Sequence, residues 1–260
     1  MYLGDAIGSD NCPINHVSTL VTFFARLRLH KLKLSPDKSR IGTVRVDFLG
    51  HLISEDGLGP NDGRVAALSR MPMPSDIKQL RCLLGGLSYY RKFLPDMARH
   101  IRPITALLKK GAKFDFTPTM ADKLRTLLEE LAAPPILVFP DWDAVTDKLR
   151  LFRLHCDAST AGFGATLEQE QCDGSIRPIV YISRATLANE QNWNPLELEA
   201  GCIIWSIRRL RRYLFGVFFL VFTDHECLQQ IRKIGETMHT TLDGVPFGLR
   251  LQLILSPRQR

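Results

Sequence analysis

Residues 151–223 show a change of hydrophobic period that limits the folds open to this chain. Three short apolar runs predict strands, and Asp173-Gly174 between the last two predicts a tight hairpin. A long amphipathic helix follows, and then a fourth apolar run. The four predicted strands are Leu151–Cys156, Phe163–Glu168, Ile176–Ser183 and Phe218–Thr223. Three antiparallel strands, a crossover helix and one more strand make a mixed α/β sheet.

The predicted crossover helix has a well-defined start. Asn194 suits the N-cap, Pro195 suits the first turn, and Glu197 completes an Asn-x-x-Glu capping box. The apolar residues of the helix run on to Leu214. Glu197 therefore has a structural task, whereas Glu199 has none and precedes a small or apolar run in which an uncompensated charge is disfavoured.

Three acidic residues stand where such a sheet would bring them together. Asp157 follows the first predicted strand, Asp224 follows the fourth, and Glu199 lies one turn inside the helix. Ligands gather at strand ends in α/β sheets, and clustered carboxylates suit Mg²⁺. Two such ions about 4 Å apart can activate water and stabilise a leaving oxygen in phosphodiester cleavage. The alternative is that each aspartate forms a turn or caps a helix, as a single strand-end aspartate usually does.

The upstream chain is predicted to be mostly helical. Val17, Leu20, Phe24 and Leu27 have helical spacing, and a strand pair with Val44, Val46 and Phe48 follows before a hinge at Ser54–Pro60. Ser75 is expected to cap a helix with an apolar stripe, and Pro118–Ala132 to form another. A short helix is predicted near Cys227, and no element in residues 233–260. The leucines of the two helical stripes are Leu80, Leu83, Leu84, Leu87, Leu124, Leu127, Leu128 and Leu131.

Composition narrows the class of protein. A net charge of +7 suits a polyanionic partner such as nucleic acid. The six cysteines form no Cys-x-x-Cys pair and are widely scattered, which indicates reduced thiols rather than a zinc site or a disulfide framework. No apolar run is long enough to span a membrane, and no signal peptide is evident. We therefore expect an intracellular protein of the cytoplasm or nucleus that is not secreted.

Several sequence blocks resemble gypsy-group LTR retrotransposon reverse transcriptases. LHCDASTAGFGATLEQ, IVYISRATLANEQNW, ELEAGCIIWSIRRLRRYLFG and FTDHECL are similar to successive blocks of the ribonuclease H (RNase H) domain of that family. Upstream, KLKLSPDKSRIG, VDFLGHLIS and GGLSYYRKFLPDMA are similar to the preceding polymerase segments. The resemblance covers residues 1 to about 236.

The resemblance implies a multi-domain α/β chain. Residues 1–58 would be the remnant of the palm, 59–145 a mostly helical thumb or connection, 146–236 an RNase H-like mixed sheet with a crossover helix, and 237–260 a divergent tail. Asp157, Glu199 and Asp224 would be catalytic acids that bind two Mg²⁺ or Mn²⁺ ions.

Nucleic-acid contacts follow from the same resemblance. Phe48-Leu49-Gly50-His51 is similar to the primer grip, and Arg91 and Lys92 would contact a duplex backbone. Arg208, Arg209, Arg211 and Arg212 could bind hybrid phosphates beside the acids. The alternative for these four is a solvated face that complements the negative end of the helix dipole.

The family pattern is broken at two places. Tyr2-Leu3-Gly4-Asp5 resembles the Tyr-x-Asp-Asp polymerase hairpin, but Gly4 replaces its first metal-binding aspartate. The parent polyprotein segments on both sides, which include the fingers and most of the palm, are expected to be missing. After Glu236 the sequence also departs from the family, which places a fourth metal-binding aspartate in that region. We therefore expect no polymerase activity and an impaired RNase H.

The favoured hypothesis is a retroelement fragment that hydrolyses RNA paired to DNA. The rival is a catalytically dead remnant that binds nucleic acid through its basic surfaces. A third hypothesis is an unstable relic with no function of its own.

Overall fold

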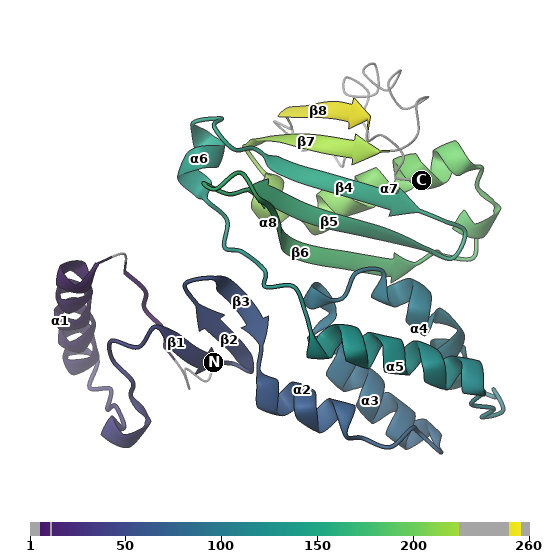
Figure 1. Ribbon diagram of the computed structural model, residues 1–260, viewed down its shortest axis with the longest axis horizontal. Coiled ribbons are helices and arrows are strands. Elements are labelled where there is room, and N and C mark those ends of the chain that lie inside the picture. Colours follow the sequence, from purple (N-terminus) through teal and green to yellow (C-terminus); the bar gives the residue numbers. More distant parts are fainter. Residues whose placement is uncertain (1–5, 11, 224–249, 256–260) are drawn as a thin grey trace.

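The computed structural model describes residues 6–10, 12–223 and 250–255, the last of these as backbone only. Figure 1 shows an N-terminal part with helix α1 and a small sheet, a group of helices, and a larger sheet with its own helices. These three parts follow one another in the chain, and two separate hydrophobic cores form in the second and third.

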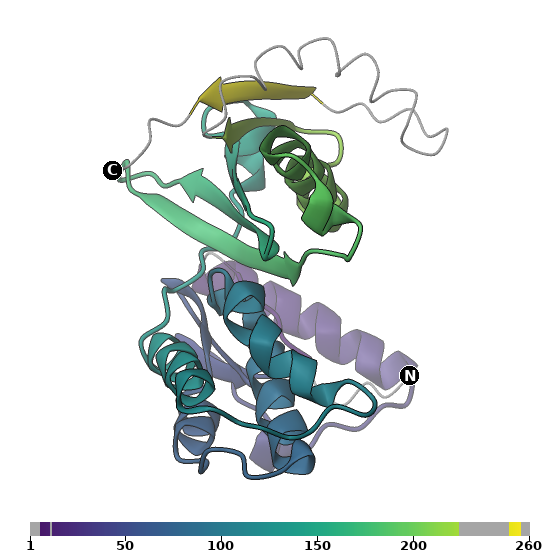
Figure 2. The same ribbon diagram turned by 90° about the vertical axis from the view of Figure 1, so that its right-hand side faces the viewer.

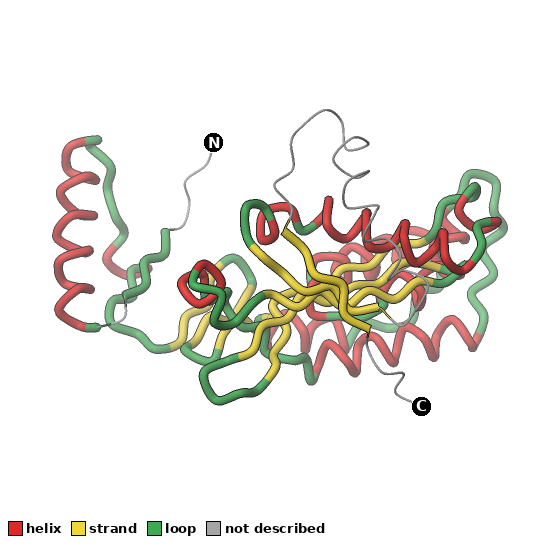
Figure 3. The backbone as a smooth tube through the Cα atoms, turned by 90° about the horizontal axis from the view of Figure 1, so that it is seen from above, coloured by secondary structure: helices red, strands yellow, loops and turns green. Residues whose placement is uncertain are grey.

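The N-terminal part consists of one long helix and a three-stranded antiparallel sheet in the order β1-β2-β3. The helix predicted around Val17 and Phe24 is confirmed, but none of its residues is buried. Figures 1 and 3 show that it stands apart from the other elements. The elements are α1 (Pro13–Leu29), the 3-10 turn η1 (Pro36–Lys38), β1 (Arg45–Phe48), β2 (His51–Ser54) and β3 (Gly57–Pro60).

The helical region, residues 61–132, packs its helices around one leucine-rich core. The eight leucines of the two predicted stripes are all buried. The prediction of a helix at Pro118–Ala132 is also confirmed. The elements are α2 (Asp62–Ser69), α3 (Ile77–Tyr89), η2 (Arg91–Phe93), α4 (Met97–Thr105), η3 (Ala106–Leu108) and α5 (Pro118–Ala132).

The third part is built on a five-stranded mixed sheet in the order β6-β5-β4-β7-β8. Strand β5 pairs antiparallel with both β4 and β6. Strands β4 and β7 run parallel as neighbours, and β8 pairs parallel with β7. The predicted Asp173-Gly174 hairpin and the predicted antiparallel arrangement of β4, β5 and β6 are therefore confirmed. The strands are β4 (Phe152–Ala158), β5 (Gly162–Glu170), β6 (Ile176–Ala185), β7 (Phe218–Thr223) and β8 (Arg250–Leu255).

Helix α7 lies against one face of this sheet (Figure 2). Cys202, Ile203 and Ile207 on α7 share a core with Leu154 of β4 and Val221 of β7. Burial of these apolar side chains is the main stabilising term for a crossover helix of this kind. The surrounding helices are α6 (Trp142–Thr146), η4 (Glu190–Asn192), α7 (Pro195–Arg209) and α8 (Arg211–Leu214).

Helix α4 joins the helical region to the large sheet by packing against β5 and β6. Ala98 N donates to Ser183 Oγ at 3.1 Å, and Arg91 Nη2 donates to the Ser183 carbonyl at 2.9 Å. Arg102 Nη1 reaches the Thr160 carbonyl at 2.9 Å. These bonds fix the helical region at the end of the sheet where β4 and β6 finish.

Two local predictions in the N-terminal half are wrong. Ser54–Pro60 is not a hinge, because it contains β3, and the amide and carbonyl of Leu58 both bond to Leu137 at 2.7 and 3.0 Å. Gly57 permits this approach, since a side chain there would meet the Leu137 carbonyl. The N-cap of α3 is Asp76 rather than Ser75: Asp76 Oδ1 accepts from Gln79 N at 2.7 Å.

Two predictions in the C-terminal half also need correction. The crossover helix ends at Arg209 rather than running on to Leu214, because Leu210 leaves the helical conformation (φ −95°, ψ 15°) before α8 begins. Residues 233–260 were predicted to contain no element, yet β8 pairs with the edge of β7 over six residues. The helix predicted near Cys227 falls outside the described residues.

Candidate active site

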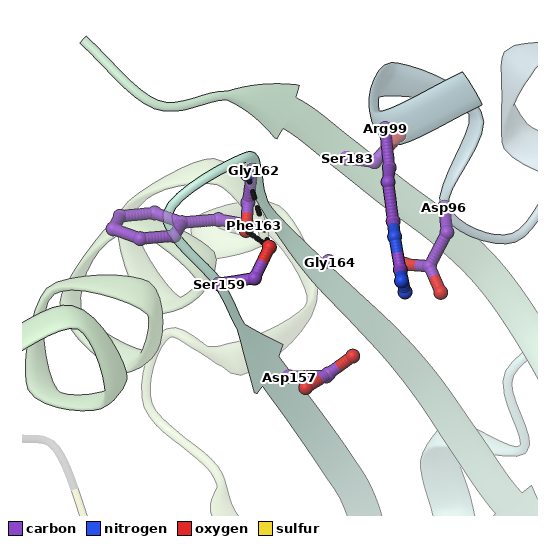
Figure 4. A pocket seen from close by; sticks show the side chains of 8 residues that line it. All are labelled: Asp96, Arg99, Asp157, Ser159, Gly162, Phe163, Gly164 and Ser183. Carbon is purple, nitrogen blue, oxygen red and sulfur yellow. Dashed lines mark hydrogen bonds between the residues drawn. The ribbon is translucent and has the colours of Figure 1, made fainter. Parts of the chain in front are cut away.

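Asp157 lies near the end of β4, at the centre of the large sheet. Phe152, Leu154 and Cys156 of this strand are buried toward α7, whereas Asp157 is exposed. Its residue partner on β5 is Gly164. Figure 4 shows the Asp157 carboxyl group extending toward the side chains of Asp96 and Arg99, which line the same pocket. The central aspartate is thus held on a rigid strand and open on one side.

Glu199 reaches the same end of β4 from helix α7. It is only 7% exposed. Its Oε1 atom accepts a hydrogen bond from the amide of Ala158, the residue after Asp157, at 3.3 Å. The Glu199 carboxylate is therefore held at the residue that follows Asp157, although 41 residues of chain separate Glu199 from Ala158.

The position of α7 on the strands is fixed by its start and by its second turn. The predicted capping box is present: Asn194 Oδ1 accepts from Glu197 N, and Asn194 N donates to Glu197 Oε2, both at 2.9 Å. Further along, Cys202 Sγ donates toward the carbonyls of Asp157 and Gly164 at 3.4 Å each. These contacts set how far along β4 the Glu199 carboxylate reaches.

The third predicted acid, Asp224, lies outside the described residues. The chain leads to it along β7, where Phe222 pairs with His155 in parallel register and Thr223 is the last residue described before Asp224. Among residues 6–10, 12–223 and 250–255, no three His, Cys, Asp or Glu side chains form a group that could hold a metal ion. Asp157 and Glu199 therefore supply an incomplete set of oxygen ligands by themselves.

Asp96 and Arg99 are pocket residues that the sequence did not indicate. Both come from the start of α4, in a different part of the chain from the sheet. Asp96 has a left-handed backbone (φ 46°), and its carboxylate lies against Gly164, where a side chain would clash with it. A left-handed Asp is uncommon, but aspartate tolerates this conformation better than most residues. No local sequence pattern announces such a contact, because it depends on the docking of α4.

His155 lies on the same face of β4 as Asp157, two residues earlier. Its ring stacks on Phe222 with centroids 4.4 Å apart, and its Nε2 atom lies 3.4 Å from Glu168 Oε2. Burial lowers the pKa of His155 and raises the pKa of Glu168, so each shift favours the uncharged form. Burial thus outweighs the mutual attraction of this pair, and we do not count it as a strong ion pair.

The four residues predicted as a primer grip, Phe48 to His51, form the tight turn between β1 and β2. Leu49 and Gly50 have positive φ angles of 47° and 75°, which is the type I′ pattern of a two-residue hairpin. The Tyr90 hydroxyl donates to the Gly50 carbonyl at 2.9 Å, and the Tyr89 hydroxyl donates to the Leu49 carbonyl. Helix α3 therefore anchors the tip of this hairpin.

His51 stacks on Tyr89 with ring centroids 5.2 Å apart. Burial, followed by the nearby charges of Lys92 and Arg64, lowers the pKa of His51 to about 4. Burial also lowers the pKa of Lys92, whose Nζ lies 5.3 Å from the centre of the Phe93 ring. His51 is therefore neutral at pH 7, and the hairpin presents aromatic and backbone groups rather than an added charge.

The remaining predicted site residues are arginines, which the structure describes, and the polymerase-type residues Gly4 and Asp5, which it does not. Arg91 bonds to the Ser183 carbonyl, so it joins two parts of the chain in addition to any contact with nucleic acid. The four arginines at the end of α7 and in α8 are all exposed, and Arg211 lies over the Phe215 ring at 5.1 Å. Gly4 and Asp5 lie outside the described residues. The four arginines are Arg208, Arg209, Arg211 and Arg212.

Residues 147–243 match the family described as the RNase H-like domain found in reverse transcriptase. Most of the chain also aligns with Pol polyproteins of retrotransposons from Drosophila melanogaster. It is 33% identical over 240 residues to the retrovirus-related Pol polyprotein from transposon 297, which covers 91% of this chain and 21% of that relative. The corresponding figures for transposon gypsy are 32% over 241 residues, 88% and 22%.

The chain is homologous to the Pol polyproteins of LTR retrotransposons. It spans about a fifth of the length of the curated relatives it matches. The RNase H-like domain is the part for which the family match, the predicted strand order and the described sheet agree.

Solved structures of a viral reverse transcriptase share this fold. A structure of the foamy viral protease-reverse transcriptase with double-stranded DNA superposes with a TM-score of 0.77 at 18% identity, covering 97% of this chain and 44% of that one. The same protein in complex with an RNA/DNA hybrid gives 0.74 at 19% identity, with 97% and 34% covered. In the described part of the chain, no helix is long and apolar enough to cross a membrane.

Proposed function

We propose that the RNase H-like domain hydrolyses the RNA strand of RNA–DNA hybrids, using Asp157, Glu199 and Asp224. The observation that carries this proposal is the bond between Glu199 Oε1 and Ala158 N, which attaches the side chain of Glu199 to the residue that follows Asp157. Strand β7 leads to the third acid as the immediate neighbour of β4. The complexes of the foamy viral enzyme with double-stranded DNA and with RNA/DNA hybrid support a nucleic-acid substrate.

The donor set fits a hard divalent cation. All three proposed ligands are carboxylates, which Mg²⁺ and Mn²⁺ prefer, and the set contains neither thiolate nor imidazole. Asp157 is exposed and held on a strand, whereas Glu199 is buried and oriented by a backbone donor. Two Mg²⁺ ions bound by these acids would make a water molecule more acidic and offset charge on the phosphate.

The acidic and basic side chains of this domain would then position the substrate for hydrolysis. In the hydrolysis, the water oxygen bonds to phosphorus, the bond from phosphorus to the leaving oxygen breaks, and a proton passes to that oxygen. The exposed arginines of α7 and α8 would hold flanking phosphates by charge. Asp157 and Glu199 would keep their geometry because a strand and a capped helix hold them, so little reorganisation is needed.

The proposal includes two losses relative to the parent family. Gly4 has no side chain to bind a metal ion, so we propose that this chain does not polymerise DNA. The sequence after Glu236 lacks the expected aspartate block, so we propose that hydrolysis is slower than in a complete domain. The rival hypothesis is a dead nucleic-acid-binding remnant that keeps only basic surfaces such as the exposed arginines of α7 and α8.

A pair of matched glutamate variants tests the proposed activity. The assay is Mg²⁺-dependent cleavage of a labelled RNA–DNA hybrid by the full chain. We expect Glu199→Gln and Asp157→Asn to lower cleavage by at least ~100-fold, because each removes a charged ligand. Glu197→Gln is the control, two residues from Glu199. Its amide oxygen can still complete the capping box, so cleavage should stay near wild type.

Hybrid binding separates the two hypotheses. Asp157→Asn should bind the hybrid as well as the wild type or more tightly, because one negative charge is removed. A wild-type chain that binds hybrid but shows no Mg²⁺-dependent cleavage would establish the binding remnant. Template-dependent primer extension by the chain would contradict the proposed loss of polymerase activity.

A further inference from the structure

A bidentate ion pair lies beside the segment that leads into helix α7. Arg184 Nη1 and Nη2 bond to the two carboxylate oxygens of Glu190 at 2.6 and 2.7 Å. Glu190 is only 5% exposed, and its Oε2 atom also accepts from Leu187 N at 2.7 Å. The Arg184 bond is the largest cause of a lowered Glu190 pKa. This carboxylate is therefore charged, paired and bonded to the loop between β6 and α7.

The guanidinium of Arg184 also lies over two neighbouring aromatic rings, whose centres are 6.3 Å apart. It lies 4.3 Å from the centre of the Phe163 ring on β5 and 5.4 Å from that of Trp205 on α7. Cation–π contacts of this kind strengthen when the cation is partly removed from water. One side chain thus connects β6, β5, the following loop and the crossover helix.

The loop before α7 also contacts the helix closely, at Gly201. A side chain at Gly201 would meet Trp193 and, further away, Phe163. Gly201 therefore allows α7 to approach both rings, two residues after Glu199. Trp193 lies at the end of the loop to which Glu190 is bonded. The Trp193 and Phe163 rings therefore both pack against this turn of the helix.

We infer that Arg184 is a positioning residue that sets how closely Glu199 approaches the amide of Ala158, the residue after Asp157. The inference rests on the proposed function for its catalytic consequence but not for its structural one. Arg184 is not a catalytic residue, because none of its described contacts is with Asp157 or Glu199. It acts through Phe163, Trp205 and the Glu190 loop. Loss of its planar fork should let α7 shift relative to β4.

The Ala158 amide is a direct reporter of this position, since its acceptor is Glu199. The experiment measures hydrogen exchange at Ala158 and Leu154 in the full chain. Arg184→Lys keeps the charge but loses the bidentate and stacked geometry. We expect exchange at Ala158 to speed up roughly tenfold, the scale of one ordinary hydrogen bond. Exchange at Leu154, which is fully buried in the same strand, should not change.

Two variants calibrate the measurement. Glu199→Ala removes the acceptor and gives the largest acceleration that Ala158 can show. Arg125→Lys is the control, because Arg125 forms an exposed pair with Asp122 on α5 with a 2.8 Å bond. It should leave both amides unchanged. Unchanged exchange at Ala158 in Arg184→Lys would overturn the inference, and so would equal acceleration at Ala158 and Leu154, which would show general destabilisation.

The catalytic consequence has a separate readout. If the wild type cleaves hybrid, Arg184→Lys should need roughly tenfold more Mg²⁺ for half-maximal cleavage, the scale of the effect of residues that orient metal ligands. Its KM for the hybrid should not change. A raised KM at an unchanged Mg²⁺ requirement would contradict a positioning role. If the wild type does not cleave, the proposed function fails, and the exchange at Ala158 still decides the inference.

Discussion

Helices α1 and α7 have similar lengths and both begin with proline, yet they end in different environments. α1 has apolar residues at helical spacing but none of its 17 residues is buried. α7 has 15 residues, of which six are buried against the sheet. The periodic pattern therefore predicts helix formation in both cases, but stabilisation by burial occurs only where a partner surface is present.

Within the N-terminal part, the β1–β2 hairpin is bonded to the rest of the protein, whereas the apolar side chains of α1 are exposed. Ile14, Val17 and Val21 of α1 are between 60 and 82% exposed. The hairpin tip at residues 49–51, in contrast, is held by both tyrosine hydroxyls of α3. Local stability should therefore be low in α1, higher at the hairpin, and highest in the core under α7.

The largest expected effect compares two isoleucines, one on each helix. Ile207→Ala should destabilise the RNase H-like domain by about 2–5 kcal/mol, because it leaves a cavity in a site that is 2% exposed. Ile14→Ala, at a site that is 82% exposed, should change stability by less than about 0.5 kcal/mol. Urea unfolding followed by tryptophan fluorescence measures the first, since Trp142, Trp193 and Trp205 all lie in or beside that domain.

Ile14→Ala also tests the description of α1. A loss of stability comparable to that of Ile207→Ala would show that α1 is packed against another surface in solution. Circular dichroism of both variants would separate a local loss of helix from global unfolding.

An intermediate effect is expected from the pH dependence of the hairpin contact. The pKa of His51 is lowered to about 4 in the folded chain, from about 6.5 when unfolded. As the pH falls from 6.5 toward 4, the unfolded chain binds a proton that the folded chain does not. The stability contributed above pH 6.5 is therefore lost on acidification, by about 1–2 kcal/mol after allowance for partial exposure.

His51→Phe keeps a ring on Tyr89 and removes this titration. Hydrogen exchange of α3 should then depend less on pH between 6.5 and 4 than in the wild type. Tryptophan fluorescence should keep its wild-type pH dependence, because His155 and the Arg184–Glu190 pair of the RNase H-like domain are untouched. An unaltered pH profile of α3 would contradict the shifted pKa.

The smallest effects compare the two N-caps. Asn194 accepts from Glu197 N at 2.9 Å, so Asn194→Ala should cost about 1 kcal/mol. In α1 the cap is Cys12, whose sulfur is 3.4 Å from Asn15 N and is a weak acceptor. Cys12→Ser should raise the helicity of α1 slightly, by a few tenths of a kcal/mol at most, roughly the scale of an improved cap. A fall in helicity by circular dichroism would contradict this assignment.

Much of the RNase H-like domain could be predicted because its helices, strands and turns are each marked by a local sequence pattern. The Asp173-Gly174 hairpin, the Asn194–Glu197 capping box and the short apolar strands each carry their own pattern, and all are present. The assignment of Glu197 to the capping box also followed from spacing and is confirmed, whereas the role of Glu199 as a metal ligand stays a prediction.

Other features depend on partners that lie far away in the chain. β8 forms a strand by pairing with the edge of β7. Ser54–Pro60 is ordered because the backbone of Leu58 bonds to Leu137, far along the chain. Asp96 enters the candidate site only because α4 docks on β5 and β6. Each depends on contacts between distant residues, which override local preference.

The sequence alone determined the order of strands and helices, the capped start of α7 and the acids worth examining. It did so because backbone hydrogen bonding, capping and apolar periodicity act over a few neighbouring residues. Only the tertiary structure decided that Glu199 meets Ala158, that Arg184 connects four elements, and that the apolar stripe of α1 stays exposed. Those outcomes depend on which surfaces come into contact, and burial and pairing gain their energy only there.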